Sequence, residues 1–202
     1  MRNQVCIIGL GQFGRHLARR LASMDCDVLA IDVNEAAVQD IRDAVQQAVI
    51  TDVRDLEALR SVVTTDIDEV IVSLGESMEA SILCTLHLKT IGIKRIRAKA
   101  TTDDHAAILR AVGATDVIFP ERETAERMAQ RILHPDLLDY LPLSPEYRVV
   151  EINTPTSFAG RSLAELHLRK NWRLMVVAVK TANGRIEFLP SGELVLVSNS
   201  SL

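Results

Sequence analysis

The stretch Gly9-Leu10-Gly11-Gln12-Phe13-Gly14 decides the fold of this chain, because it has the spacing G-x-G-x-x-G. The preceding run 5–8 (VCII) is apolar without alternation, which is typical of a strand buried on both faces of a parallel sheet. Glycines so spaced allow a tight turn, close approach of the backbone to a pyrophosphate, and close packing of the next helix on the strand. The free N–H groups and dipole at that helix start favour phosphate, so we assign these residues to a nucleotide site.

An acidic residue at the end of the next apolar run completes the pattern. The run 28–31 (VLAI) predicts a second buried strand, and Asp32 follows it, 18 residues after Gly14. A carboxylate at this spacing accepts hydrogen bonds from the ribose hydroxyls of adenosine and repels a 2′-phosphate. The alternative is a glycine-rich turn with a helix-capping Asp. The joint register of strand, glycines, helix, strand and acid favours the nucleotide site.

Length and composition indicate one larger and one smaller domain. The 202 residues leave room for a domain of about 130 to 150 residues and a second, smaller one. A hydrophobic content of 48% with few aromatic residues predicts an aliphatic core. No apolar stretch reaches the ~18 residues that span a bilayer, and no signal peptide is evident, so we expect a cytosolic protein. Cys6, Cys26 and Cys84 are widely spaced, which favours reduced core thiols over a disulfide or metal site.

Strand and helix patterns continue to alternate after Asp32. The sequence predicts strands at 5–8, 28–31, 48–51, 69–73, 96–99 and 116–119. It predicts helices after the glycine loop, at 34–46, in a short stretch capped by Asp55, and at 77–90, 103–112 and 122–133. This alternation predicts the α/β class, with a Rossmann-like doubly wound parallel sheet followed by a small α+β C-terminal module.

The carboxyl ends of the predicted strands carry polar side chains. Ligands of doubly wound sheets bind in the crevice at these ends. Asp32, Asp52, Ser73, Lys99 and Glu121 come from separate strands and are therefore expected to face the same crevice as the glycine loop. We include all five in the candidate cofactor-binding set.

The chain changes character after about residue 134. Residues 136–145 contain two prolines and several leucines, which indicates a crossover segment that docks on another surface. Short strands are expected at 148–152 and 174–180, a short helix at 162–166, a hairpin at Asn183-Gly184 that returns through 186–189, and an apolar run at 193–197. The expected organisation is thus 1–134 (nucleotide-binding), 135–145 (crossover) and 146–202 (C-terminal module).

Catalytic and metal-binding patterns are missing from the sequence. The C-terminal module has a single histidine, His167, beside two leucines, which is more typical of a structural residue than of a catalytic base. The other histidines lack metal-ligand spacing, and no nucleophile elbow or P-loop lysine is present. The net charge of −4 without an aromatic-interleaved basic stripe also argues against nucleic acid. We therefore expect a binding protein, with no enzymatic activity and no catalytic or metal site.

Several longer strings resemble the RCK domain of the regulatory subunits of Trk/Ktr potassium-uptake systems. They are VCIIGLGQFGRHLARRL at 5–21, AIDVNE at 30–35, VITD at 49–52, DLEALRSV at 55–62, VIVSLGESMEASILCTLHLK at 70–89, RAKA at 97–100 and FPE at 119–121. The string SLAELHLRKNW at 162–172 is similar to the TrkA-C module of that family. The resemblance covers nearly the whole chain.

The resemblance implies roles for several residues. It implies glycines around the phosphates, Asp32 on the ribose, Asp52 near the adenine, and Glu121 near the terminal phosphate or a divalent or monovalent cation bound there. A carboxylate beside polyphosphate is repulsive unless a cation or arginine intervenes. The alternative for Glu121 is a first-turn acid of the following helix, and both interpretations stay open.

The sequence departs from the family pattern in three places. Many Ktr-type members carry Arg where this chain has Gln12, whereas Trk-type members more often have Gln. The last strand of the family, which ends in a glycine, is missing, so we expect a truncated module with an exposed sheet edge. Arg169 matches one polar position of a cyclic di-AMP site, but no matching asparagine lies near Met175, so we favour a solvated basic patch.

The resemblance implies a cytosolic regulatory (gating) subunit that senses NAD(H), ATP or ADP. It further implies a homo-oligomer, in which dimers build a ring, bound to an integral-membrane potassium transporter subunit. The protein would then be peripheral at the inner face of the cell membrane. The alternatives are an NAD-dependent oxidoreductase fragment and a free-standing nucleotide-binding interaction module.

Overall fold

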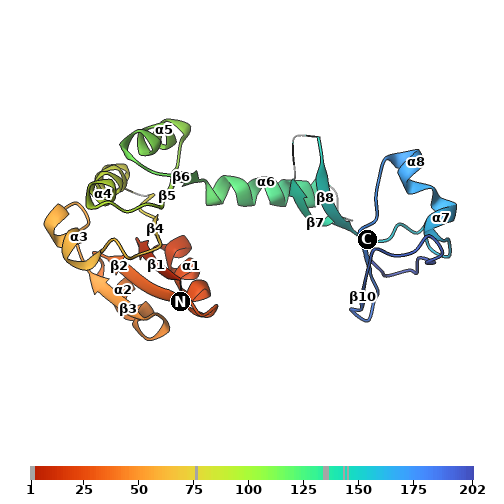
Figure 1. The fold of residues 1–202 in the computed structure, drawn as a ribbon, viewed down its shortest axis with the longest axis horizontal. Helices are drawn as coiled ribbons and strands as arrows, with labels where there is room; N and C mark the ends of the chain where they lie inside the picture. Colours follow the sequence, from red (N-terminus) through yellow and green to blue (C-terminus); the bar gives the residue numbers. More distant parts are fainter. Residues whose placement is uncertain (1–2, 76, 134–136, 143, 145) are drawn as a thin grey trace. The chain divides into compact units, whose positions relative to one another are not determined.

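The computed structural model describes residues 3–75, 77–133, 137–142, 144 and 146–202. The chain divides into two compact units, residues 1–122 and 123–202. The first unit contains a parallel sheet in the order β3-β2-β1-β4-β5-β6 (Figure 1). Its strands are β1 (Gln4–Ile8), β2 (Asp27–Asp32), β3 (Gln47–Ile50), β4 (Glu69–Val72), β5 (Ile96–Lys99) and β6 (Asp116–Ile118). The predicted Rossmann-like doubly wound sheet is confirmed.

Helices cover both faces of this sheet. They are α1 (Gln12–Ala22), α2 (Glu35–Ile41), α3 (Leu56–Val62), α4 (Met78–Ile91) and α5 (Asp103–Val112). Ala18 of α1 and Val38 of α2 pack with Ile7 and Ala30 on one face. Helices α3, α4 and α5 close the other face over a larger aliphatic core. Because both faces are covered, the strands contain near-continuous apolar runs.

Helix starts in the first unit differ in how their N–H groups are satisfied. The side chains of Asn34, Asp55, Ser77 and Thr102 each accept a backbone hydrogen bond at the start of α2, α3, α4 and α5. Helix α1 begins after Gly11, which has no side chain to do so. The first N–H groups of α1 are therefore left for water or a ligand.

Two glycines allow the β1–α1 turn to pack against its neighbours. Gly9 has φ = +92°, and a Cβ atom there would lie 2.6 Å from the carbonyl oxygen of Ser73. A Cβ atom on Gly14 would lie 1.9 Å from the carbonyl oxygen of Gly9. Gly11 is different, because nothing lies within 4 Å of a Cβ atom built on it. Two of the three glycines are thus required by packing within the chain.

Several predicted boundaries in the first unit shift. The helix predicted at 34–46 ends as α-helix at Ile41 and continues as the 3₁₀ helix η1 (Arg42–Ala44), because Val45 is already extended. Helix α6 (Pro120–Leu133) begins two residues earlier than predicted, since proline suits the first helical turn. Glu121 therefore lies in the first turn of α6.

The second unit contains short elements. Strand β7 (Leu137–Pro142) pairs antiparallel with β8 (Arg148–Ile152), and β9 (Ala178–Lys180) pairs with β10 (Ile186–Phe188). Helices α7 (Leu163–Leu166) and α8 (Leu168–Trp172) lie between these pairs in sequence. Leu166, Leu168, Val179 and Leu196 form its small core.

Two predictions for this unit need correction. The segment predicted as a crossover contains β7, whose hydrogen-bond partners come from β8; residues 135, 136, 143 and 145 lie outside the described residues. The strand predicted at 174–180 is limited to β9, because its partner β10 ends at Phe188, opposite Ala178, and the next residue, Leu189, has a left-handed backbone. The run 193–197 contributes a single bridge, between Val195 and Ser162.

The cysteines are free thiols in the structure. Cys6 and Cys84 are fully buried in the larger core, and burial raises the pKa of both thiols. Cys26 is only partly buried and donates to the carbonyl of Asn3. Within the described part of the chain, no helix has the length and apolar character needed to cross a bilayer.

Replacing Gly14 should damage the fold far more than replacing Gly11. Gly14→Ala forces α1 away from the Gly9 carbonyl, at a cost of about 3 kcal/mol or more. Gly11→Ala has open space and loses only an N-cap preference, about 1 kcal/mol or less. Thermal unfolding followed by circular dichroism measures both. Equal melting temperatures for the two variants would contradict the packing argument.

Candidate nucleotide-binding site

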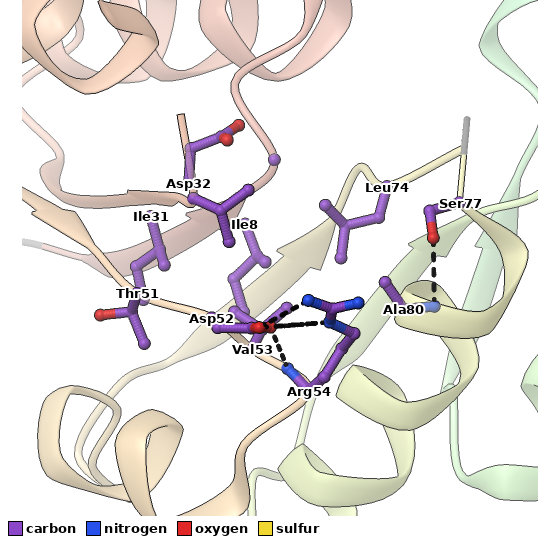
Figure 2. Close-up of a pocket in the computed structure, with 12 residues that line it drawn as sticks. Ile8, Ile31, Asp32, Thr51, Asp52, Val53, Arg54, Leu74, Ser77 and Ala80 are labelled. Atoms are coloured by element: carbon purple, nitrogen blue, oxygen red, sulfur yellow. Dashed lines mark hydrogen bonds and ion pairs between the residues drawn. The ribbon is translucent and has the colours of Figure 1, made fainter. Parts of the chain in front are cut away.

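A pocket of about 240 Å³ opens at the carboxyl ends of β1 to β4 (Figure 2). It is lined by Ile8, Gly9, Ile31, Asp32, Val33, Thr51, Asp52, Val53, Arg54, Leu74, Ser77 and Ala80. Apolar side chains dominate this set, with charge supplied by two aspartates and one arginine. A small apolar pocket with few polar groups is the usual form of a small-molecule site.

The carboxylate of Asp32 is held by the backbone on both sides. One oxygen accepts from the N–H of Leu10 at 2.5 Å, and the other accepts from the N–H of Asn34 at 2.8 Å. These bonds tie the end of β2 to the glycine loop and fix the orientation of the carboxylate. Each oxygen has two lone pairs, so the group can still accept hydrogen bonds from a ligand.

Asp52 forms a tight pair with Arg54. The Nε atom of Arg54 lies 3.0 and 3.2 Å from the two carboxylate oxygens, and NH2 lies 2.7 Å from one of them. The backbone N–H of Arg54 also donates to Asp52, at 3.0 Å. Hydrogen bonds from Arg54 lower the pKa of Asp52 from 3.8 to about 2. The pair is therefore ionised at any physiological pH.

The phosphate end of the predicted site is formed by backbone. Gln12 is exposed at the first position of α1, whereas Phe13 packs against the core. Arg15 lies one turn further and is bound to Asp40 of α2 at 3.1 Å, together with Arg19. The Arg15 side chain is thus engaged by Asp40, and the first backbone N–H groups of α1 follow the glycine loop directly in sequence.

A second charged cluster lies at the end of β5. The Nζ atom of Lys99 is 2.5 Å from a carboxylate oxygen of Glu121, and this hydrogen bond lowers the pKa of Glu121. A Cβ atom on Gly75 would lie 3.1 Å from the Lys99 side chain, so the lysine packs against the β4–α4 loop. Lys99 already supplies the positive partner that Glu121 was expected to need, and the cation predicted there stays a prediction.

The structure brings together only part of the predicted set. Gly9, Asp32 and Asp52 line the pocket, while Gly11, Gln12, Phe13, Gly14, Lys99 and Glu121 do not. Ser73 also lies outside the lining, and its backbone carbonyl faces Gly9. Among the described residues, no group of three or more His, Cys, Asp or Glu side chains could hold a metal ion.

Arg54, Leu74 and Ala80 line the pocket without having been predicted from the sequence. Arg54 follows the predicted Asp52 by two residues, a spacing that lets a turn bring the two side chains together. Leu74 and Ala80 come from the β4–α4 loop and from α4. The string VIVSLGESMEA contains both residues, but nothing in it predicts that they face the pocket.

The fold and the site define the class of protein. A six-stranded doubly wound sheet, a glycine-rich turn before α1 and an acid at the end of β2 are the features of Rossmann-like nucleotide-binding domains. Residues 5–120 match the TrkA-N domain family, and the chain therefore belongs to it. The resemblance to RCK domains expected from the sequence is confirmed.

Relatives and solved structures agree with this assignment. The chain is 37% identical over 180 residues to the Ktr system potassium uptake protein C of Bacillus subtilis, covering 89% of this chain and 81% of that protein. The crystal structure of the GsuK RCK domain aligns over 100% of this chain and 44% of its own, with a TM-score of 0.65 and 20% identity. The GsuK channel bound to NAD aligns over 100% of this chain and 36% of its own, also with a TM-score of 0.65 and 20% identity.

Asp52 should titrate well below an ordinary carboxyl group. Its folded pKa of about 2 lies below the usual 3.8, so any stability that the pair contributes is present above pH 4 and is lost as the pH falls through about 2. Arg54→Met should return the pKa toward 3.8. Carboxyl-carbon NMR titration measures both values, with Arg60→Met, on the exposed side of α3, as the control. An Asp52 pKa near 4 in the unmodified protein would contradict the paired geometry.

Proposed function

We propose that this chain is a regulatory subunit of a potassium-uptake system and that it binds an adenine nucleotide in its first unit. The relationship to the Ktr system potassium uptake protein supports the transport role. The geometry around Asp32 carries the ligand assignment, because this carboxylate is fixed beside the glycine loop and faces a pocket.

The described residues fit a nucleotide bound along the glycine loop. Gly11 has open space where a Cβ would sit, so a phosphate can approach the backbone there. The uncapped N–H groups of α1 supply donors, as at other phosphate-binding helix starts. Asp32 holds the ribose and the pocket receives the base. A GsuK channel with the same fold is described as bound to NAD, which supports this ligand class.

The phosphate end of the site gives little basis for choosing between nucleotides. Gln12 is a neutral donor, and Arg15 is bound to Asp40. Neither provides a dedicated charge for a γ-phosphate. NAD(H), ATP and ADP are therefore all candidate ligands in this proposal. The regulatory conformational change would then respond to whether the site is occupied, or to whether the nicotinamide is oxidised or reduced.

The proposed partners are a second copy of the chain and a membrane-embedded potassium transporter subunit. Dimers would build a ring at the inner face of the membrane. Co-purification with the transporter subunit, with and without nucleotide, tests this role. Loss of the complex upon nucleotide exchange, or a change in transport by reconstituted vesicles, is the expected result. A hydride-transfer screen with NADH, if positive, would instead favour an oxidoreductase.

Removing the Asp32 carboxylate should weaken nucleotide binding. Each charge-assisted hydrogen bond to the ribose contributes about 1.5 to 3 kcal/mol, so Asp32→Ala should raise the dissociation constant at least tenfold. Isothermal titration calorimetry measures the change. Glu35→Ala removes a nearby exposed acid that does not line the pocket and serves as the control. Unchanged affinity in Asp32→Ala would contradict the ribose assignment.

The preference between nucleotides should depend on Gln12. ATP, ADP and NADH should bind within about tenfold of one another, a spread of ~1.4 kcal/mol. Gln12→Arg adds a charge at the start of α1 and should shift the preference toward ATP. Competition titrations with the three nucleotides measure both effects. ATP binding more than a hundredfold tighter than ADP in the unmodified protein would show that another group senses the γ-phosphate.

A further inference from the structure

Arg54 presents a flat cation to the pocket that we assign to the base. Figure 2 shows its guanidinium turned toward Asp52, with Leu74 and Ala80 among the other lining residues. The lining set contains no other basic side chain. A planar guanidinium stacks on aromatic rings, and a purine offers such a ring.

Asp52 fixes the plane of that cation. Its Oδ1 atom accepts from Nε and from the backbone N–H of Arg54, and its Oδ2 atom accepts from Nε and Nη2. These bonds use most of the acceptor capacity of the carboxylate, so Asp52 is poorly placed to recognise a base by itself. The bonds also prevent free rotation of a side chain that is otherwise half-exposed. Asp52 therefore acts on the ligand through Arg54.

The remainder of the pocket suits the second face of a ring. Leu74 and Ala80 supply partly exposed apolar surface, and Asp32 lies at the side where the ribose is expected. Among the described lining residues, the polar groups other than Asp32, Asp52 and Arg54 are the hydroxyls of Thr51 and Ser77. Ser77 already caps α4. Few groups are left to recognise the exocyclic atoms of a base.

We propose that Arg54 stacks on the purine base of the bound nucleotide and that Asp52 is its positioning residue. This inference rests on the proposed nucleotide site. Stacking uses the face of the ring and is tolerant of its substituents, so Arg54 by itself does not distinguish adenine from guanine. A pyrimidine offers a smaller ring and binds more weakly. Arg54 thus sets selectivity for ring size, and Asp32 sets the position of the ribose.

Variants of Arg54 distinguish the contributions of its positive charge, its planar guanidinium and its aliphatic side chain. Arg54→Met keeps an apolar stem and should weaken ADP about five- to tenfold, with a smaller effect on UDP. Arg54→Lys keeps the charge without the plane and should recover only part of the loss. Asp52→Asn weakens the hydrogen bonds that hold the guanidinium. Its affinity for ADP should therefore lie between that of the unmodified protein and that of Arg54→Met. Arg60→Met, outside the pocket, should leave both affinities unchanged.

A spectroscopic measurement reports the stack directly. The Nε–H resonance of Arg54 should move upfield when ADP binds, because the ring current of adenine acts on a group above its face. Ribose 5-phosphate lacks the base and should cause no such shift. Calorimetry and NMR on the full chain with ADP, UDP and ribose 5-phosphate provide both sets of data.

The outcomes distinguish this inference from the function on which it rests. If the unmodified protein fails to bind ADP, the nucleotide site itself is wrong, and the inference is overturned with it. If ADP binding depends on Asp32 but Arg54→Met and the unmodified protein bind ADP equally, only the stacking role is overturned. Loss of ADP affinity together with the upfield shift, while UDP changes little, supports the assignment.

Discussion

The close approach of Gly14 to the carbonyl of Gly9 is the constraint on which the first unit depends. A side chain at position 14 would overlap backbone, so α1 can begin where it does only with hydrogen at that Cα. The same approach brings α1 onto β1, and the helix begins at the carboxyl end of that strand. Leu10, held in the loop between these glycines, donates to Asp32 and connects the loop to β2. The packing that stabilises the turn therefore also shapes the candidate site.

Three basic side chains of the first unit are paired with acidic side chains of the same chain. Arg54 is paired with Asp52, Lys99 with Glu121, and Arg15 with Asp40. Because each of these three cations already has an acidic partner, the negative charge of the proposed nucleotide would be met by backbone donors or by exchange of one of these pairs. Backbone donors favour phosphate without distinguishing the number of phosphates. If the proposed function holds, this pairing predicts weak selectivity for the number of phosphates on a bound nucleotide.

The sheet, the glycine turn and the position of Asp32 at the pocket could be predicted from the sequence. Each depends on residues close in sequence or on a strongly periodic pattern. The direction of Arg54 could not be predicted, because it is set by a turn around Asp52 that spacing alone does not specify. The pair of Lys99 and Glu121 spans 22 residues and depends on where α6 begins. Strand β7 was missed because its prolines and leucines suggested a connector, and its hydrogen-bond partners come from β8.

The two buried thiols, Cys6 and Cys84, are protected from thiol reagents while the first unit is folded. Cys6 lies on β1 and Cys84 on α4, on the face of the sheet that α3, α4 and α5 cover. A thiol reacts as its thiolate, and burial disfavours that form at both positions. Alkylating reagents and oxidants can therefore reach these sulfurs only when α4 separates from the sheet. The rate at which these cysteines are labelled therefore measures how often the fold opens on this face. A ligand bound between β2 and α1 contacts the other face. Such a ligand would slow the labelling only if both faces open in one cooperative step.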